Sequence, residues 1–387
     1  MAEALAKQGK KLPLYGPLDI QNYKAFLEES KEKFIGRHNT VFHSDISIQG
    51  FEALATLGRG SFGSVKLVRE KDSDNYYAVK VQLKQKIKQN ESSHRVYLEK
   101  QVLFGMDFPF CVRIEHYCHD KDAIYFLMPF VRGGELYNLI KKFGRFQSSM
   151  TRFYAAQVVL ALEFFQYIHF VYRDLKPENI LVDHTGFLKI TDYGLAKEVS
   201  SRTYTICGTP AYMAPEVVEG SGYARSADWW SLGILIFEMA YGKPPYIAKD
   251  SVELFTMILY APVPMRSVFS SQLKSLLRGL LQKDVTFRLG NLKNGAEDVK
   301  KHPWFKNIDW LQLLNRRVQP PYVPETSGPA DTSNFPFAAK VAASSHNIKT
   351  IQANTIRQEL FGEKTKTKRK TRFCGKSLND SLFQASV

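Results

Sequence analysis

The sequence predicts an α+β protein with a small β-rich lobe, a larger helical lobe and an extended C-terminal tail. From Phe51 to about Val131, short alternating runs rich in β-branched and aromatic residues predict strands, interrupted by one helical stretch, SSHRVYLEKQVLFG. From Glu135 to about Trp304, the apolar spacing becomes mostly helical. At 387 residues, 44% of them hydrophobic, the chain can bury the core of one large bilobal domain or of two compact units.

Segments at both ends lie outside these lobes. Residues 19–36 place apolar side chains near helical spacing with charges between them, which predicts an amphipathic helix docked on the body. Past Asp309 the chain becomes loop-like, and it ends in the basic run KTKTKRKTR, which we expect to be mobile. The expected divisions are 1–50 (N-terminal helix and linker), 51–131 (small lobe), 132–305 (large lobe) and 306–387 (tail).

The net charge of +15 is concentrated at the C-terminal end. Residues 340–387 hold ten Lys and Arg against three Asp and Glu, which is +7 of the total. The basic run has no interleaved aromatic residues on which bases could stack. We therefore expect no nucleic acid partner, although nuclear import through this run remains an alternative to a solvated tail.

Membrane and metal signals are weak. No apolar run reaches membrane-spanning length, and Ala2 stands where N-myristoylation would need Gly. The cluster of Cys111, His116, Cys118 and His119 matches no zinc spacing, and the four cysteines show no disulfide framework. We expect a monomeric chain without a membrane anchor, located in the cytoplasm, with entry into the nucleus left open.

A glycine-rich segment, GRGSFGSV, places Gly58, Gly60 and Gly63 in a G-x-G-x-x-G pattern. This pattern alone fits either a dinucleotide-binding turn or an ordinary hairpin. A dinucleotide site needs a helix after the glycines, whereas SVKLV continues here as a second strand. The segment therefore favours a β-hairpin laid over phosphate groups.

A lysine follows in the apolar strand YYAVKV. Such a lysine, Lys80, is usually an exposed-edge residue, but Glu99 lies nineteen residues later on the interrupting helix. Pairing with Glu99 would hold the ammonium group against the α- and β-phosphate oxygens of a nucleotide.

Two further motifs, YRDLKPEN and TDYG, supply Asp174, Lys176, Asn179 and Asp192. Phosphoryl transfer needs metal ions across the phosphates, a carboxylate for the hydroxyl proton and a cation for the developing charge. Asn179 and Asp192 can hold Mg²⁺, which prefers oxygen ligands. Asp174 can accept the proton, and Lys176 can neutralise the γ-phosphate. Each motif alone fits a solvated surface loop, but their common order leaves that alternative little room.

These motifs, closed by APE at residues 214–216, resemble the signature set of the eukaryotic protein kinases. FPF, GGEL, RFYAAQ, ICGTPAYMAPE, RLGNLKNG and GPADTSNF extend the resemblance over about residues 20–337 to the AGC serine/threonine kinases of the cAMP-dependent type. The resemblance implies a bilobal fold: a small antiparallel sheet lobe with one key helix, and a large, mainly α-helical lobe. An N-terminal helix and a wrapping tail complete it, and ATP binds in the cleft.

The resemblance also implies an activity and its partners. ATP and Mg²⁺ would be used to phosphorylate Ser or Thr hydroxyls preceded by basic residues, and a cAMP-binding regulatory subunit is a candidate partner. A scaffold with a weak or lost activity is the alternative. It is disfavoured because all five residues that the chemistry needs are present: Lys80, Glu99, Asp174, Asn179 and Asp192.

The nucleotide site is implied position by position. Met128 would lie behind the adenine at the gatekeeper position, and Phe335 would close the adenine pocket from the tail. The residues implied to contact or position the nucleotide are Leu57, Gly58, Gly60, Ser61, Phe62, Gly63, Val65, Ala78, Lys80, Glu99, Met128, Val131, Glu135, Glu178, Leu181 and Phe335.

The implied substrate site is acidic. Glu135, Glu178 and Glu238 match positions that bind arginines before the phosphorylated residue, because carboxylates bind Arg bidentately. A solvated surface is the ordinary interpretation of a single glutamate. The residue after the substrate hydroxyl would enter an apolar pocket formed by Ile206, Pro210 and Met213.

The segment RTYTICGTPAY holds three threonines with different implied roles. Thr205 matches the activation-loop phosphosite. Thr209, counted with the catalytic residues, would bridge Asp174 and Lys176. Thr203 is expected to be loop filler.

A phosphate on Thr205 can order the loop only if positively charged side chains lie close enough to bind it. The expected cations are Arg173, Lys197 and Arg95. The family usually has His where Arg95 stands, so we expect a phosphate contact that does not titrate near neutral pH.

Several positions depart from the family pattern. Tyr193 replaces the commoner Phe of the D-F-G motif, and we expect its ring to fill the hydrophobic stack and its hydroxyl to be tolerated. Tyr204 and Phe255 replace a Trp and a Tyr that the family uses to dock its regulatory subunit. A kinase uncoupled from cyclic-nucleotide regulation is therefore a second alternative.

Overall fold

The structure is a computed structural model that describes residues 19–40, 46–60 and 63–338. Two compact units are present. The first, here the large lobe, contains Met1–Gly36, Gly105–Val112 and Val131–Ser327, and the second, here the small lobe, contains Arg37–Phe104, Arg113–Phe130 and Gly328–Val387. The domain limits expected from the sequence remain predictions.

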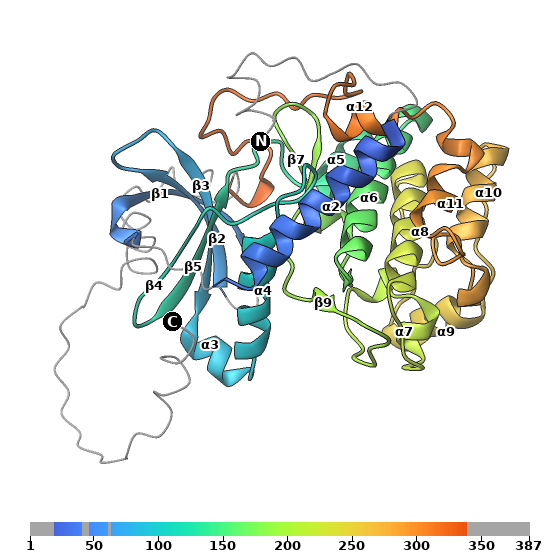
Figure 1. The fold of residues 1–387 in the computed structure, drawn as a ribbon, viewed down its shortest axis with the longest axis horizontal. Coiled ribbons are helices and arrows are strands. Elements are labelled where there is room, and N and C mark those ends of the chain that lie inside the picture. Colours follow the sequence, from blue (N-terminus) through green and yellow to red (C-terminus); the bar gives the residue numbers. More distant parts are fainter. Residues whose placement is uncertain (1–18, 41–45, 61–62, 339–387) are drawn as a thin grey trace. The chain divides into compact units, whose positions relative to one another are not determined.

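The small lobe is built on a five-stranded antiparallel sheet in the order β1-β2-β3-β5-β4 (Figure 1). Its strands are β1 Phe51–Arg59, β2 Gly63–Glu70, β3 Tyr76–Leu83, β4 His116–His119 and β5 Ala123–Pro129. A short η1 helix, Ile48–Gly50, precedes β1, and the helices α3, Lys84–Gln89, and α4, Ser93–Gly105, follow β3. The alternating β-branched and aromatic residues thus form strands, and the helical stretch SSHRVYLEKQVLFG forms α4. The short helix α3 before it was not predicted from the sequence.

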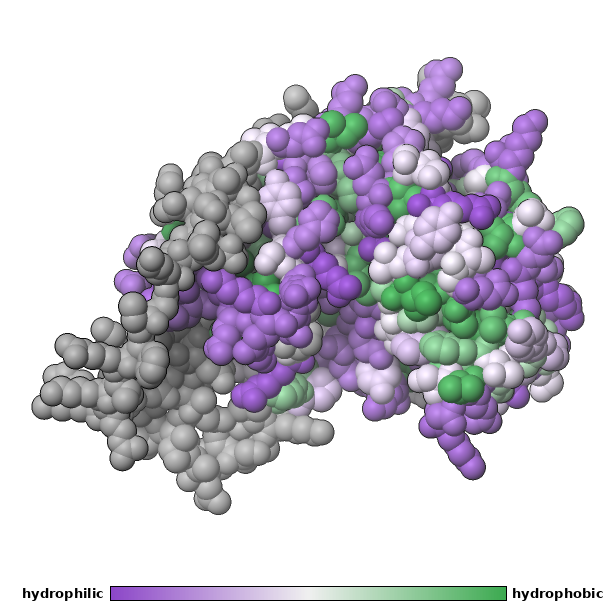
Figure 2. Space-filling view, turned by 90° about the horizontal axis from the view of Figure 1, so that it is seen from below, coloured by the Kyte–Doolittle hydropathy of each residue, from purple (hydrophilic) through white to green (hydrophobic). Residues whose placement is uncertain are grey.

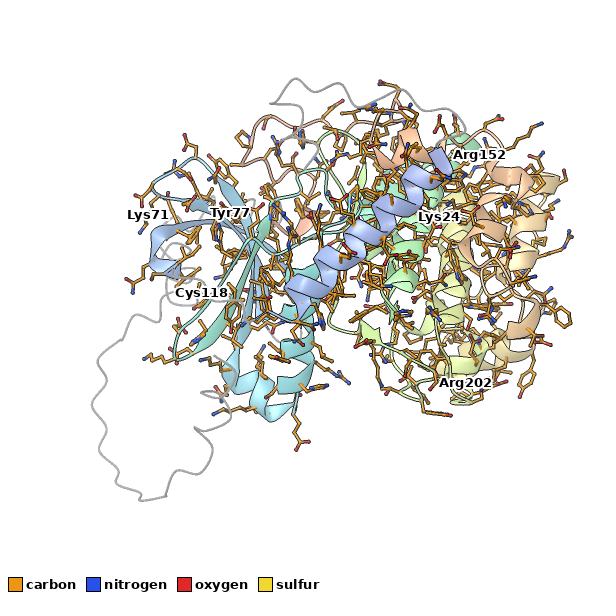
Figure 3. All side chains as sticks on the ribbon, viewed as in Figure 1. Lys24, Lys71, Tyr77, Cys118, Arg152 and Arg202 are labelled. Atoms are coloured by element: carbon orange, nitrogen blue, oxygen red, sulfur yellow. The ribbon has the colours of Figure 1, made fainter. Side chains whose placement is uncertain are left out.

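Each face of this sheet packs against an apolar cluster. One cluster contains Phe51, Val79, Val81 and Leu127 together with Tyr77 and Cys118, which Figure 3 labels on the sheet. The other cluster contains Leu57 and Leu67 with Phe335 and Ala338, two residues of the C-terminal segment. Side chains alternate between the two faces along a strand. β3 is the central strand, with a hydrogen-bonded neighbour on each side.

The large lobe is mainly helical. Its helices are α2 Asp19–His38, α5 Leu136–Phe143, α6 Ser148–Tyr167, α7 Pro215–Val218, α8 Ser226–Tyr241, α9 Ser251–Tyr260, α10 Ser271–Leu280, α11 Ala296–Lys300 and α12 Trp310–Leu314. The short helices are η2 Pro177–Asn179, η3 Pro210–Tyr212, η4 Val285–Phe287 and η5 Pro303–Phe305. Helix α8 is apolar on nearly every side and is therefore a core helix, with Trp229 and Trp230 fully buried.

Two small antiparallel ribbons carry the loops between α6 and α7. Strand β6, Phe170–Val171, pairs with β9, Lys197–Glu198, and β7, Ile180–Val182, pairs with β8, Leu188–Ile190. The turn of the second ribbon lies under the later chain: a Cβ at Gly186 would come within 2.2 Å of the Tyr322 carbonyl oxygen. Only glycine fits at this position, where the turn of the ribbon packs against the backbone of the later segment.

Helix α2 docks on α6, as its amphipathic pattern predicts, and continues two residues past Gly36. The Tyr23 hydroxyl donates to the Glu163 carboxylate, and the Lys300 ammonium lies 4.2 Å from the centre of the Tyr23 ring. Nearer the end of α2, Phe34 meets Phe164 edge-on at 6.4 Å between ring centroids.

Membrane-spanning helices and cysteine pairing can be checked for the described residues. Within residues 19–40, 46–60 and 63–338, no helix has the length and apolar character to cross a bilayer. Cys111 and Cys118 are buried free thiols. The basic run at 364–372 lies outside the described residues.

A buried ion pair joins distant parts of the large lobe. Arg288 is fully buried and donates from Nη1 and Nη2 to the two carboxylate oxygens of Glu216, at 2.5 and 2.9 Å. The Arg288 Nη1 group also donates to the Ser226 carbonyl at 3.1 Å, at the start of α8. Arg288 therefore connects the loop after η4 with Glu216 on α7 and with the start of α8.

We expect Glu216→Gln to lower the free energy of unfolding by about 3–5 kcal/mol, because it leaves the Arg288 charge buried without its partner. Urea unfolding followed by tryptophan fluorescence measures this change. Arg69→Gln is the control, since the Arg69–Glu52 pair, 2.7 Å apart, is exposed and its loss should change stability by less than about 1 kcal/mol. Equal effects of the two variants would contradict the prediction.

Candidate active site

The loop that carries Asp174 is fixed by a buried carboxylate from α8. Asp228 accepts the backbone N–H groups of Tyr172 and Arg173 at 2.8 and 2.9 Å. Burial raises the pKa of Asp228 to about 6, while these two N–H groups act in the opposite direction by favouring the ionised form. Arg173 adopts a left-handed backbone conformation, with φ at 71°. The two hydrogen bonds stabilise this uncommon conformation and so set the direction in which Asp174 leaves the loop.

Asp174 lies in a closed hydrogen-bond network. Lys176 Nζ lies 2.8 Å from Asp174 Oδ2 and donates to Thr209 Oγ1, also at 2.8 Å. The Thr209 hydroxyl in turn donates to Asp174 Oδ1 at 2.9 Å. Asn179 Nδ2 donates to Asp174 Oδ2 at 2.8 Å and to the Asp174 carbonyl at 3.0 Å. Both oxygens of the Asp174 carboxylate are therefore oriented, and its neighbours come from two separate segments of the chain.

Residues suited to Mg²⁺ lie beside this network. The Thr191 N–H donates to the Asn179 carbonyl at 3.0 Å, which brings the residue before Asp192 against Asn179. Because the Asn179 amide nitrogen donates to Asp174, its side-chain oxygen is the atom left to face a cation. An amide oxygen and a carboxylate are ligands that Mg²⁺ accepts. The donor set of this lobe fits that metal.

Tyr193 differs from the sequence expectation. Its ring is fully buried, 5.9 Å from Phe165 and 6.1 Å from Tyr172 between centroids, and so fills the hydrophobic stack. The hydroxyl is not merely tolerated, because it lies 2.8 Å from the Ile190 carbonyl and 2.9 Å from the Val112 carbonyl. Burial raises the pKa of Tyr193 well above its usual value. The hydroxyl thus ties the residue after Asp192 to two backbone segments.

The activation segment corrects the expectation for Thr203. This residue is buried, exchanges two backbone hydrogen bonds with Tyr223 at 2.8 and 2.9 Å, and accepts from Lys197 Nζ at 3.1 Å. It is an anchor of the segment and not loop filler. Thr205, in contrast, is exposed, and its carbonyl accepts from the Tyr223 hydroxyl at 2.6 Å.

Arg173 approaches the same segment from the loop that carries Asp174. Its Nε donates to the Leu195 carbonyl at 2.6 Å, and its Nη1 lies 3.5 Å from the Tyr223 hydroxyl that holds the Thr205 carbonyl. Lys197 contacts Thr203, two residues before Thr205. Arg95 belongs to the small lobe, and its part in reading a phosphate remains a prediction.

Two carboxylates of the large lobe, those of Glu135 and Glu238, are affected by the charge of a third, Glu178. Burial, and to a lesser degree the negative charge of Glu178, raises the pKa of Glu135 and brings that of Glu238 to about 7. Glu135 precedes α5, and Glu238 lies on α8, where it accepts from the Tyr212 hydroxyl. Carboxylates in such surroundings gain from an incoming cation, since it offsets both burial and the negative charge of Glu178.

The small lobe contributes the predicted ion pair. Lys80 Nζ lies 2.5 Å from Glu99 Oε1, so the lysine is not a free exposed-edge residue. A Cβ at Gly63 would come within 1.9 Å of the Val81 carbonyl oxygen, so the third glycine allows β2 to approach β3. Gly58 and Gly60 lie at the end of β1 with open space around them, and Ser61 and Phe62 lie outside the described residues.

The expected adenine residues of the small lobe share one apolar face. Leu57, Val65 and Ala78 belong to the cluster that contains Phe335, and Phe335 lies 5.6 Å from Phe130 between ring centroids. Met128 is buried and pairs with Ala78 in the β3–β5 register. Val131 and Leu181 belong to the large lobe, where Leu181 forms a backbone bridge with Glu135.

We expect Tyr193→Phe to lower the free energy of unfolding by about 1–2 kcal/mol, because two buried carbonyl groups lose their shared donor. Thermal or urea unfolding measures the change. Tyr167→Phe is the control, since its hydroxyl bonds to Glu28 at an exposed position and should matter less. Unchanged stability of the Tyr193 variant would show that its hydroxyl is only tolerated.

Comparisons with known proteins identify the family. The family model described as the protein kinase domain matches residues 51–305. Over 318 residues, 81% of this chain, the chain is 42% identical to a Drosophila melanogaster protein named cAMP-dependent protein kinase catalytic subunit 2, of which 90% is covered. It is 44% identical over 289 residues to the human cAMP-dependent protein kinase catalytic subunit PRKX, with 75% of this chain and 81% of that protein covered.

A yeast relative agrees with these matches. The cAMP-dependent protein kinase type 3 of Saccharomyces cerevisiae is 42% identical over 290 residues, which cover 75% of this chain and 73% of that protein. The family match, the antiparallel sheet of one lobe and the helices of the other confirm the predicted bilobal α+β fold. The chain therefore belongs to the protein kinase family, as an ATP- and Mg²⁺-dependent serine/threonine kinase of the AGC, cAMP-dependent catalytic-subunit type.

Proposed function

We propose that this kinase transfers the γ-phosphate of ATP to Ser or Thr hydroxyls that follow basic residues, with Asp174 as the proton acceptor. The observation that carries the proposal is the network in which Thr209 and Lys176 both engage the Asp174 carboxylate. An oriented carboxylate next to a fixed cation is what an attacking hydroxyl and a charged phosphoryl group need.

In this proposal each side chain has one task. Asp174 orients the substrate hydroxyl and takes its proton, and Lys176 offsets the charge of the transferred group. Asn179 and Asp192 would hold Mg²⁺, which neutralises the phosphate oxygens when bound. Thr209 keeps Asp174 and Lys176 at a constant separation. In the small lobe, Lys80, positioned by Glu99, would bind the α- and β-phosphates.

The basic preference rests on Glu135, Glu178 and Glu238. Because burial and the negative charge of Glu178 raise the pKa of Glu135 and Glu238, an arginine side chain would stabilise their ionised forms and bind bidentately. Next to the phosphorylated residue, Ile206, which is 59% exposed, Pro210 and the buried Met213 would receive an apolar side chain. Substrate selection would thus combine charge before the hydroxyl with an apolar contact after it.

Activation would follow phosphorylation of Thr205. The threonine is exposed, as a kinase substrate must be, while its neighbours Thr203 and Tyr223 are held in place. A phosphate there would meet Arg173 and Lys197, which already contact the same segment. Arg173, Lys197 and Thr205 all belong to the large lobe.

A partner protein could bind an exposed hydrophobic surface of the large lobe. Figure 2 shows hydrophobic surface on the large lobe, around the end that carries α7 and α9. Tyr204 is 66% exposed, and its ring lies over Gly222, where a Cβ would meet it at 2.5 Å. A cAMP-binding regulatory subunit is the first candidate partner, because the relatives are named cAMP-dependent kinases. Kinase activity unaffected by such a subunit would favour the uncoupled alternative.

We expect Thr205→Ala to lower the rate of phosphorylation of an Arg-Arg-x-Ser peptide by about tenfold or more, because the charge-assisted contacts of the phosphate are lost. Initial rates with ATP and Mg²⁺ measure the effect. Ser201→Ala is the matched control, since Ser201 is exposed in the same segment and should leave the rate unchanged. A Thr205 variant as active as the wild type would rule out this switch.

The acidic site predicts a pH dependence. As pH falls from 8 to 6, Glu238, whose pKa is about 7, takes up a proton and loses its charge. The KM for the Arg-Arg-x-Ser peptide should therefore rise severalfold, while the KM for the same peptide with Ala in place of both Arg should change little. Glu238→Gln should flatten the difference. Parallel pH profiles for the two peptides would contradict the proposed role.

A further inference from the structure

A second side chain of β3 engages the carboxylate that pairs with Lys80. Gln82 Nε2 donates to Glu99 Oε2 at 3.0 Å, while Lys80 Nζ lies 2.5 Å from Glu99 Oε1. Gln82 and Glu99 are 2% and 3% exposed. Lys80 and Gln82 are two residues apart on one strand and therefore point to the same face. Both oxygens of one carboxylate on α4 are thus held from one strand.

The strand that supplies these two groups is the central strand of the sheet. β3 is paired with β2 over Gly63–Arg69 on one side and with β5 over Ala123–Pro129 on the other. Its position at the centre of the sheet follows from the strand order β1-β2-β3-β5-β4. Gln82 itself pairs with Gly63 and Ile124. The amide donor therefore comes from a fixed backbone, and its bond to Glu99 constrains the helix rather than the strand.

The presence of an amide at this position is itself informative. Among the residues that the structure describes, Gln82 Oε1 is buried without a hydrogen-bond partner. Burying such an oxygen is unfavourable, and an apolar side chain would fill the same space without that penalty. The one polar contact that Gln82 makes with its nitrogen goes to Glu99. The donor, rather than the bulk of the side chain, is what this position supplies.

Helix α4 has other supports within the small lobe, among them the buried Val96. The Ile114 N–H donates to the Leu103 carbonyl at 3.1 Å, and the Lys100 ammonium lies 3.9 Å from the centre of the Tyr117 ring. Lys80 contacts one oxygen of the Glu99 carboxylate, and Gln82 contacts the other. With both contacts, the carboxylate plane and the helix that carries it are fixed.

We propose that Gln82 is a positioning residue that keeps Glu99 and α4 in place for Lys80 before nucleotide binds. The inference rests on the proposed function in one respect, namely that Lys80 binds the phosphates of ATP. If only part of the population had α4 in place, the apparent affinity for ATP would fall in proportion to that part. Gln82 raises the fraction of molecules ready to bind ATP.

The test compares Gln82→Leu and Gln82→Met, which keep an apolar side chain of similar size and remove the donor. The KM for ATP should rise about threefold to tenfold, with kcat at saturating ATP and the KM for peptide changed by less than about twofold. Amide hydrogen exchange of residues 93–105 should be faster than in the wild type without nucleotide and should slow again with saturating ATP and Mg²⁺. Thermal stability should change little, because the loss of the donor to Glu99 is offset by the removal of an unpaired buried oxygen.

Tyr125→Phe is the matched control. Tyr125 lies on β5, is buried, and loses a 2.7 Å hydrogen bond to Asp120 on the other face of the same sheet. This variant should lower the melting temperature and leave the KM for ATP unchanged. A purely structural role for Gln82 would give the same result as the control.

Unchanged KM for ATP, or unchanged exchange of α4, in both Gln82 variants would overturn the proposal. Lys80→Met separates this failure from a failure of the proposed function. If Lys80→Met retained full activity, Lys80 would not be the phosphate ligand, and the exchange measurement without nucleotide would still decide whether Gln82 holds α4.

Discussion

The two hydrogen bonds from Tyr172 and Arg173 to the buried Asp228 carboxylate are the interaction on which the rest of the large lobe's chemistry depends. They fix a backbone turn that the chain does not readily adopt alone. From that turn, Arg173 reaches the activation segment and Asp174 faces Thr209 and Lys176. A carboxylate buried on α8 therefore organises both the catalytic network and the segment whose phosphorylation we propose as the switch.

Polar groups in apolar surroundings recur in both lobes and serve the same physical purpose. Tyr193 places a hydroxyl between two carbonyls in the hydrophobic stack, and Gln82 places an amide against Glu99 in the core under the sheet. In a low-dielectric interior such bonds are strong and directional, whereas apolar contacts are tolerant of small shifts. Gln82 contacts Glu99, and Tyr193 follows Asp192, two residues to which we assign roles in phosphate and metal binding.

Much of the fold and the site could be predicted from the sequence. Alternating β-branched residues gave the strands of the small lobe, and the order of Lys80, Glu99, Asp174 and Asp192 indicated phosphoryl transfer. Such motifs are readable because they fix backbone geometry and residue type at short spacing. The positive charge of the C-terminal run, in contrast, gives no information about the active site, because the run contains none of the motifs that predict the site.

Partners formed by distant segments could not be predicted. The hydroxyl of Tyr193 bonds to Val112, eighty-one residues away, and Thr203 is buried because Tyr223 pairs with it across the activation segment. Gln82 was missed because a single Gln in a strand gives no signal until the helix that covers it is known. Its spacing of two residues from Lys80, on the same face of a strand, is the one clue that the sequence held.

The most direct test of the account is the turnover of an Arg-Arg-x-Ser peptide by the wild type and by Asp174→Asn at saturating ATP and Mg²⁺. The change preserves the shape of the side chain but removes its ability to accept the proton. Turnover should fall by about 10²- to 10⁴-fold while ATP and Mg²⁺ still bind. An Asp174→Asn enzyme that phosphorylates the peptide at close to the wild-type rate would contradict the central claim.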